Sequence, residues 1–131
     1  MSEPHWIARN VADAIHQDQL KRHGGRAGVR DENAIESALA RPRNKFSYSM
    51  RAKVWELAAA YGYGLARNHG YTDGNKRVAF AVMYTFLGLN GWHLRVSEPE
   101  VVVVVTDLAA GEITEPALAK WLKAHGVPEK G

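Results

Sequence analysis

The sequence predicts an all-α fold: a compact single-domain helical bundle, with about six helices around a central buried helix. The chain of 131 residues is long enough to bury one hydrophobic core without covalent staples. Apolar residues recur at three- and four-residue steps over most of the chain, and only residues 92–96 have an extended pattern. Because no repeat or linker divides the sequence, we expect one domain over residues 1–131.

The first two predicted helices occupy residues 6–22 and the segment after Asp31. In the first, apolar residues are spaced as in a helix until two glycines interrupt them: Ile7, Val11, Ile15 and Leu20, then Gly24 and Gly25. Asp31 can cap the second helix. Proline disfavours helical geometry in the residue before it. We therefore expect the second helix to end before Pro42 and a basic loop to follow.

Residues 52–68 and 75–89 predict the third and fourth helices. The third has one apolar face, made by Val54, Leu57, Ala58, Tyr61 and Leu65. In the fourth, apolar side chains surround the helix axis almost completely. We therefore expect the fourth helix to run through the centre of the fold.

The last two helices are predicted mainly from their capping residues. Five consecutive valines, residues 101–105, have strong strand propensity. However, Ser97 and Glu100 can form a capping box and Gly111 can end a helix, so we expect a helix here. Thr114 opens the final helix in the same way and Gly126 ends it, with three residues facing inward: Leu118, Trp121 and Leu122.

The composition excludes several classes of protein. The absence of cysteine excludes a disulfide framework and a thiolate metal site. Residues 78–89, the longest apolar stretch, are too few to span a bilayer, and residues 1–5 lack the pattern of a signal peptide. We therefore expect a cytoplasmic protein. A net charge of +3 favours anionic ligands without identifying one.

Residues 69–77, between the third and fourth helices, form the candidate active-site loop: His69, Gly70, Tyr71, Thr72, Asp73, Gly74, Asn75, Lys76 and Arg77. Lys76 and Arg77 lie in the first turn of a helix, where acidic residues are usual. Each such cation costs about 0.3–1 kcal/mol unless an anion binds. Together with Gly74, Asn75 and the free N–H groups of the helix start, they predict a phosphate site.

Two further residues supply the remaining chemistry for group transfer from a nucleotide. Nucleotide phosphates normally carry Mg²⁺, which one or two carboxylates hold, so Asp73 is the candidate metal ligand. His69 can take a proton from an attacking hydroxyl at neutral pH. Simpler roles remain open: Asp73 or Asn75 only caps the fourth helix, His69 interacts with a helix end, or His69 and Asp73 bind zinc. Capping leaves the two cations unexplained, and zinc lacks a third ligand at a motif spacing.

The loop resembles the signature of the Fic/Doc family, His-x-Phe-x-Asp/Glu-Gly-Asn-Gly/Lys-Arg. Three other segments resemble its Doc branch, the death-on-curing toxins: residues 23–31, 36–42 and 111–113. The resemblance implies a Fic/Doc-type helical fold in which His69 is the catalytic base, Asp73 the Mg²⁺ ligand and residues 74–77 the anion hole. Arg67 matches a basic position of Doc proteins, and Tyr71 replaces the signature Phe as an aromatic anchor. Both are accessory candidates.

Two departures from the signature bear on the reaction. Family members that transfer AMP usually have Gly where this chain has Lys76, and Arg where it has Phe80. Losing that Arg removes a fork that would hold the distal phosphates. For Doc-like members the resemblance implies another reaction, transfer of the γ-phosphate of ATP to a Ser/Thr hydroxyl of a translation factor such as elongation factor Tu, which would arrest translation. AMPylation by the same residues is the alternative.

The resemblance also implies a partner, because Doc proteins are toxins restrained by an antitoxin. No Ser or Thr in the chain has Glu four positions later, so the inhibitory motif of many Fic enzymes is not evident. We therefore expect a small antitoxin that binds in trans. Two non-enzymatic hypotheses compete. A nucleic-acid binder would use a basic strip of five residues, Arg41, Arg43, Lys45, Arg51 and Lys53. A catalytically inactive antitoxin partner is disfavoured because the signature residues are intact.

Overall fold

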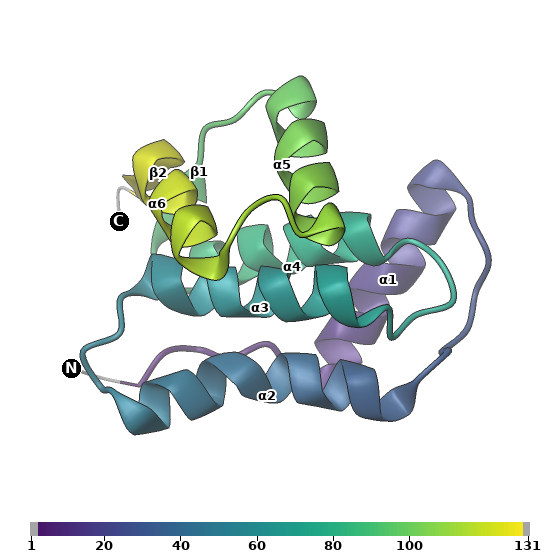
Figure 1. Cartoon of the computed structure of the whole chain (residues 1–131), viewed down its shortest axis with the longest axis horizontal. Coiled ribbons are helices and arrows are strands. Elements are labelled where there is room, and N and C mark those ends of the chain that lie inside the picture. The colour runs from purple at the N-terminus through teal and green to yellow at the C-terminus, as the bar shows by residue number, and fades with distance from the viewer. Residues whose placement is uncertain (1–2, 130–131) are drawn as a thin grey trace.

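The computed structural model describes residues 3–129 and confirms the predicted helical bundle (Figure 1). Its elements are α1 (Arg9–His23), α2 (Glu32–Tyr48), α3 (Val54–Asn68), α4 (Asn75–Leu89), β1 (Trp92–Leu94), α5 (Glu98–Ala110), α6 (Glu115–His125) and β2 (Gly126–Pro128). None of the described helices is both long enough and apolar enough to span a membrane.

The central helix is α3. Helices α2 and α4 pack along it, and α5 and α6 cover a further side (Figure 1). Leu57, Ala58 and Tyr61 of α3 have no exposed surface. On α4, by contrast, Tyr84 is 41% exposed and Phe80 is only partly buried. The prediction that the fourth helix runs through the centre was therefore wrong, because part of its apolar surface lines an open groove.

Helix α2 continues through Pro42 to Tyr48, so the predicted end before Pro42 and the predicted basic loop were both wrong. A proline inside a helix removes a backbone hydrogen bond and costs about 3 kcal/mol. Burial on both sides of Pro42 offsets this cost, since Ala38 and Phe46 pack into the core. Contact with α3 is close at Gly64, where a Cβ would lie 3.0 Å from the Ala38 Cβ.

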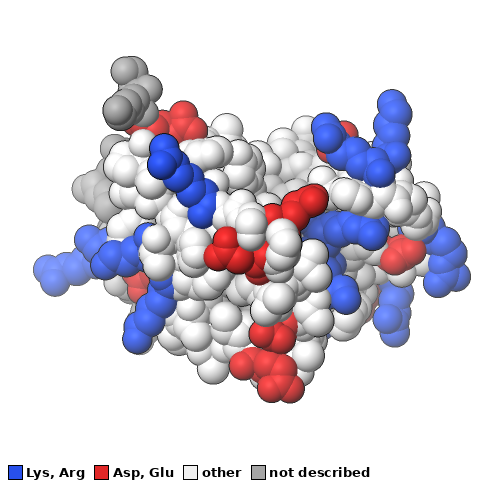
Figure 2. Space-filling view, turned by 90° about the horizontal axis from the view of Figure 1, so that it is seen from above, with Lys and Arg blue, Asp and Glu red and all other residues white. Residues whose placement is uncertain are grey.

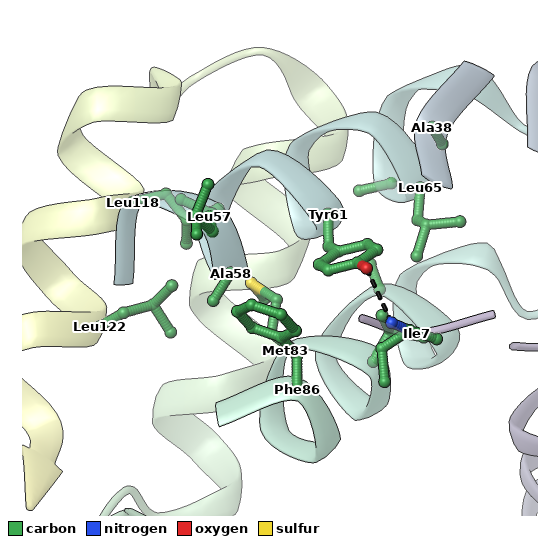
Figure 3. Close-up of a cluster of buried hydrophobic side chains, with 14 of the residues drawn as sticks. Ile7, Ala38, Leu57, Ala58, Tyr61, Leu65, Met83, Phe86, Leu118 and Leu122 are labelled. Atoms are coloured by element: carbon green, nitrogen blue, oxygen red, sulfur yellow. Dashed lines mark hydrogen bonds between the residues drawn. The ribbon is translucent and has the colours of Figure 1, made fainter. Parts of the chain in front are cut away.

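Helix α1 begins at Arg9, later than predicted, because the residues before it are extended. Ile7 is buried in this extended segment, and its N–H donates to the Tyr61 hydroxyl at 2.8 Å (Figure 3). Within α1 the buried residues are Ala12 and His16, whereas Val11 is 37% exposed. The inward face is therefore rotated from the predicted one, and it carries a histidine.

The capping residues of α5 and α6 are those predicted. The Ser97 hydroxyl accepts the Glu100 N–H at 3.3 Å, and the Glu100 carboxylate accepts the Ser97 N–H at 3.1 Å. The Thr114 hydroxyl accepts the Ala117 N–H at 3.2 Å. Both ends of the capping box are thus made, and the valine run is helical. Strand β2, which the sequence did not predict, pairs antiparallel with β1.

Candidate active site

The loop of residues 69–74 is held against the loop of residues 24–31 that joins α1 to α2. The Gly70 carbonyl accepts two backbone N–H groups of the α1–α2 loop, at 2.8 and 3.0 Å. The Thr72 N–H donates to the Gly28 carbonyl at 3.0 Å. Close approach requires a glycine at position 70, because a Cβ there would lie 2.3 Å from the Ile35 Cγ1. The Doc-like segment around residues 24–31 therefore holds the candidate loop in place through backbone hydrogen bonds.

His69 terminates α3 in the left-handed region, with φ 51°. Among residues 3–129 it is the only non-glycine residue with positive φ. This conformation costs an L-residue roughly 1–2 kcal/mol. The chain turns there, and the exposed imidazole lines the cleft in front of the loop.

Asn75 and Tyr71 close the loop on itself. The Asn75 Oδ1 accepts the Tyr71 N–H at 3.0 Å, and the Asn75 Nδ2 donates to the Tyr71 carbonyl at 2.9 Å. The side chain predicted to bind nucleotide thus fixes the loop, while the Asn75 backbone remains at the helix start. The buried Tyr71 hydroxyl donates to Asp13 Oδ1 at 2.7 Å. Burial, reinforced by this hydrogen bond and the Asp13 charge, raises the pKa of Tyr71.

The exposed Asp73 carboxylate accepts two backbone N–H groups, from Arg26 at 3.1 Å and from Gly74 at 2.9 Å. These bonds, together with the charges of Arg26 and Arg77, lower the pKa of Asp73. Each bond uses a different carboxylate oxygen, so each oxygen keeps a lone pair for a cation. Within residues 3–129 no three His, Asp or Glu side chains are grouped to hold a metal. A lone carboxylate suits Mg²⁺, which takes its other ligands from phosphate and water.

Lys76 and Arg77 are exposed in the first turn of α4, and neither forms an ion pair with any residue the structure describes. The backbone N–H groups of residues 75–77 likewise find no acceptor within residues 3–129. Figure 2 shows several Lys and Arg side chains at the right-hand end of the molecule, the end that carries these loops in Figure 1. An anion at the start of α4 would satisfy both the charges and the donors.

The predicted site residues other than the accessory candidates Arg67 and Tyr71 surround one cleft of about 400 Å³, lined by His69, Thr72, Asp73, Gly74, Asn75, Lys76, Arg77 and Ala109. Thr72 was predicted only as part of the loop, without a role of its own, and no local signal marks Ala109, which α5 brings to the cleft. Arg67 does not line it. Its guanidinium lies 5.2 Å from the centre of the Tyr63 ring and beside Gly111.

A larger groove of about 580 Å³ adjoins the cleft, and Lys76 and Arg77 line both. Its walls come from α1, α4 and α5. The apolar lining includes Phe80, Tyr84 and Val102, the last of which is 61% exposed. The cleft therefore continues along α4 into a surface suited to an apolar ligand segment or ring.

The basic strip of the nucleic-acid hypothesis lies mostly on α2. Arg41 and Lys45 pair with Glu115 of α6, at 2.6 and 3.4 Å. The Arg43 guanidinium lies 5.6 Å from the centre of the Trp6 ring. These contacts engage three of the five residues, which leaves Arg51 and Lys53 as the rest of the strip.

Comparison with known proteins identifies the family of this chain. The model of the Fic/DOC family matches residues 6–87, a range that contains the whole loop from His69 to Arg77. The chain is 30% identical over 110 residues to Protein kinase doc of Escherichia phage P1, covering 84% of this chain and 86% of the phage protein. It is 43% identical over 72 residues to Toxin Doc of Mycolicibacterium smegmatis, covering 54% of this chain and 55% of that protein. The chain belongs to the Fic/DOC family.

Proposed function

We propose that this protein is the toxin of a toxin–antitoxin pair and transfers the γ-phosphate of ATP to a Ser or Thr hydroxyl of a translation factor such as elongation factor Tu. One observation carries the proposal: a histidine, a carboxylate and two cations without an ion-pair partner among residues 3–129 line a single cleft at a helix start. The names of the relatives, a kinase and a toxin, support it.

In the proposed reaction, His69 removes the proton from the attacking hydroxyl. The hydroxyl oxygen forms a bond to the γ-phosphorus, the bond between that phosphorus and the bridging oxygen breaks, and ADP leaves with the electron pair. Lys76, Arg77 and the open N–H groups of α4 stabilise the charge on the transferring phosphoryl group. Asp73 would hold Mg²⁺, which would neutralise phosphate charge when bound. General base catalysis contributes roughly 10²–10⁴-fold to such a reaction.

Phe80 favours phosphoryl transfer over AMPylation. The signature of AMP-transferring members has Arg at this position, and an Arg there could hold distal phosphates by paired hydrogen bonds. Phe80 lies instead in the groove beside Tyr84, with 6.1 Å between ring centres. The groove wall thus offers an aromatic surface. Lys76 and Arg77 are the cations that would contact the phosphates of the bound nucleotide.

Intact-mass spectrometry of translation factors, incubated with the protein, ATP and Mg²⁺, tests this reaction. We expect a gain of one phosphate, abolished by His69→Ala and retained by His5→Ala, a surface histidine outside the cleft. Label from [γ-³²P]ATP should reach the target, and label from [α-³²P]ATP should not. A gain of AMP would instead assign the site to AMPylation, and no change on any factor would refute the proposed target class.

The proposed antitoxin would bind in trans along the groove between α1, α4 and α5. An amphipathic segment fits the exposed apolar side chains, and acidic residues in it could meet Lys76 and Arg77, whereas Arg22 already pairs with Asp18. Coexpression with a small protein encoded beside this one should relieve growth arrest, and Val102→Glu should weaken the complex. Expression without an antitoxin that leaves growth normal would argue against the toxin role.

A further inference from the structure

His16 of α1 is a polar residue in the interior: only 2% of its surface is exposed. Its ring stacks on Tyr71, with 4.0 Å between ring centres and 20° between ring planes. Its Nε2 lies 2.9 Å from the carbonyl oxygen of Asp73, which is 57 residues later in the chain. A carbonyl oxygen only accepts hydrogen bonds, so Nε2 carries the proton and donates.

This bond fixes a peptide plane that also controls the Asp73 side chain. In a trans peptide the carbonyl oxygen of one residue and the N–H of the next point in opposite directions. When His16 holds the Asp73 oxygen toward α1, the Gly74 N–H turns away from α1. There it donates to the Asp73 Oδ1 at 2.9 Å. Gly74 itself adopts the left-handed conformation, with φ 77°.

The second oxygen of the carboxylate is held from the α1–α2 loop. Asp73 Oδ2 accepts the Arg26 N–H at 3.1 Å, and the loop approaches closely at Gly25, where a Cβ would lie 3.0 Å from that oxygen. Both carboxylate oxygens therefore have fixed backbone donors. One donor belongs to the α1–α2 loop, and the other belongs to the peptide that His16 orients.

We propose that His16 is a positioning residue, which orients the Asp73 carboxylate for the Mg²⁺–nucleotide complex through the peptide shared by Asp73 and Gly74. The metal part of this inference rests on the proposed function. It assigns a role to a residue that the family signature of the loop does not include. Groups that orient a metal ligand typically change metal affinity by 10- to 100-fold when they are lost.

Three variants separate donation from packing. In His16→Gln the amide nitrogen can reach the position of Nε2 and donate. In His16→Asn the side chain is one carbon shorter and its amide falls short of the Asp73 oxygen. His16→Leu fills similar space without a donor. All three lose the ring that stacks on Tyr71, so differences among them report the hydrogen bond.

Amide hydrogen exchange of Gly74, measured by NMR without nucleotide, is the first readout. We expect slow exchange in the wild type and in His16→Gln, and faster exchange in His16→Asn and His16→Leu. The second readout is Mg²⁺ titrated at fixed ATP concentration without target protein. We expect an affinity about 10-fold weaker for Asn and Leu and within about threefold of wild type for Gln.

Equal losses in Gln and Asn, or Gly74 exchange that does not change in Asn, would overturn the inference and leave His16 as a packing residue. Thermal unfolding identifies a variant that has not folded, and the Gln and Asn pair decides the question if Leu fails. Absence of phosphate transfer from the wild type to any translation factor would refute the proposed target class. Gly74 exchange and Mg²⁺ affinity would still decide the role of His16, so the two failures are distinguishable.

Discussion

Tyr71 connects the candidate active-site loop to α1 through both its ring and its hydroxyl. The ring stacks on His16, and the hydroxyl donates to Asp13, which also accepts a hydrogen bond from Arg9 at 2.9 Å. The family signature has Phe at this position, so we expect the ring, rather than the hydroxyl, to serve the proposed reaction.

We expect Tyr71→Phe to lower the free energy of unfolding by about 1 kcal/mol, because one hydrogen bond is lost while Asp13 keeps its Arg9 partner. Phosphate transfer should persist. Urea unfolding and the transfer assay measure the two quantities. Tyr48→Phe is the matched control, since Tyr48 is 95% exposed and should show no change. Loss of transfer in Tyr71→Phe would mean that the hydroxyl takes part in the reaction.

At this scale the sequence identified candidate residues that lie close together along the chain, and their roles stay predictions. His69, Asp73, Lys76 and Arg77 fall within nine consecutive positions, and the structure places them around one cleft. The sequence did not reveal His16 or the Arg26 N–H, because their contacts with Asp73 join distant segments. A single sequence shows spacing along the chain but not which helix faces which loop.

Helices α2 and α3 meet most closely where small residues face each other. A Cβ on Gly64 would lie 3.0 Å from the Cβ and 3.1 Å from the Cα of Ala38. Backbone atoms cannot move aside as a flexible side chain can, so the two helices would have to separate. Gly88, near the end of α4, has nothing within 4 Å of its notional Cβ.

Two alanine substitutions should therefore change stability in opposite directions. We expect Gly64→Ala to destabilise the protein by about 1–3 kcal/mol through overpacking. Gly88→Ala should stabilise it by up to about 1 kcal/mol, because alanine favours helix and meets no neighbour. Chemical denaturation of both variants checks this pair. Equal effects would show that helix propensity, rather than the contact with Ala38, decides the outcome.

Helix α5 packs against α3 and α4, and its first turn carries a complete capping box. Ser97→Ala removes one half of the capping box and should cost about 1 kcal/mol. Guanidinium unfolding would measure this loss. Ser37→Ala, within α2 and outside any cap, provides the comparison and should cost less.

The elements show where sequence patterns suffice and where packing decides. Capping residues predicted α5 and α6 correctly because a cap is a local interaction. The end of α2 was misjudged because contacts of Ala38 and Phe46 outweigh the local cost of Pro42. Helix α4 has apolar residues around most of its axis, as predicted, but some of them line a groove. Hydrophobic periodicity cannot distinguish a groove from a core.

Over the whole molecule, Arg9 joins α1 to α2 near the candidate site. It donates to Asp13 of its own helix and to Glu32 and Glu36 of α2. Partial burial alone would raise the pKa of Asp13, but hydrogen bonds from Arg9 and Tyr71 outweigh it and hold the pKa lower. The Arg9 hydrogen bond likewise lowers the pKa of Glu32.

Carboxylates with lowered folded-state pKa values stabilise the fold above their unfolded pKa and lose this contribution as pH falls through the folded value. Arg9→Leu should therefore lower Tm at pH 7, and its difference from wild type should shrink below about pH 4. Calorimetry over this range measures the difference. Arg22→Leu, which loses an exposed pair with Asp18 within α1, should have little effect. A difference that grew toward low pH would contradict the assignment.

At His69, the residue that would best stabilise the left-handed backbone differs from the residue that the proposed reaction needs. Glycine would adopt this conformation without the cost that an imidazole-bearing residue incurs, but it would remove the proposed base. A lineage under selection for the reaction must keep the histidine and accept the strain. Without that selection, replacing His69 by glycine would remove the backbone strain and stabilise the fold. Loss of the proposed base would therefore increase stability.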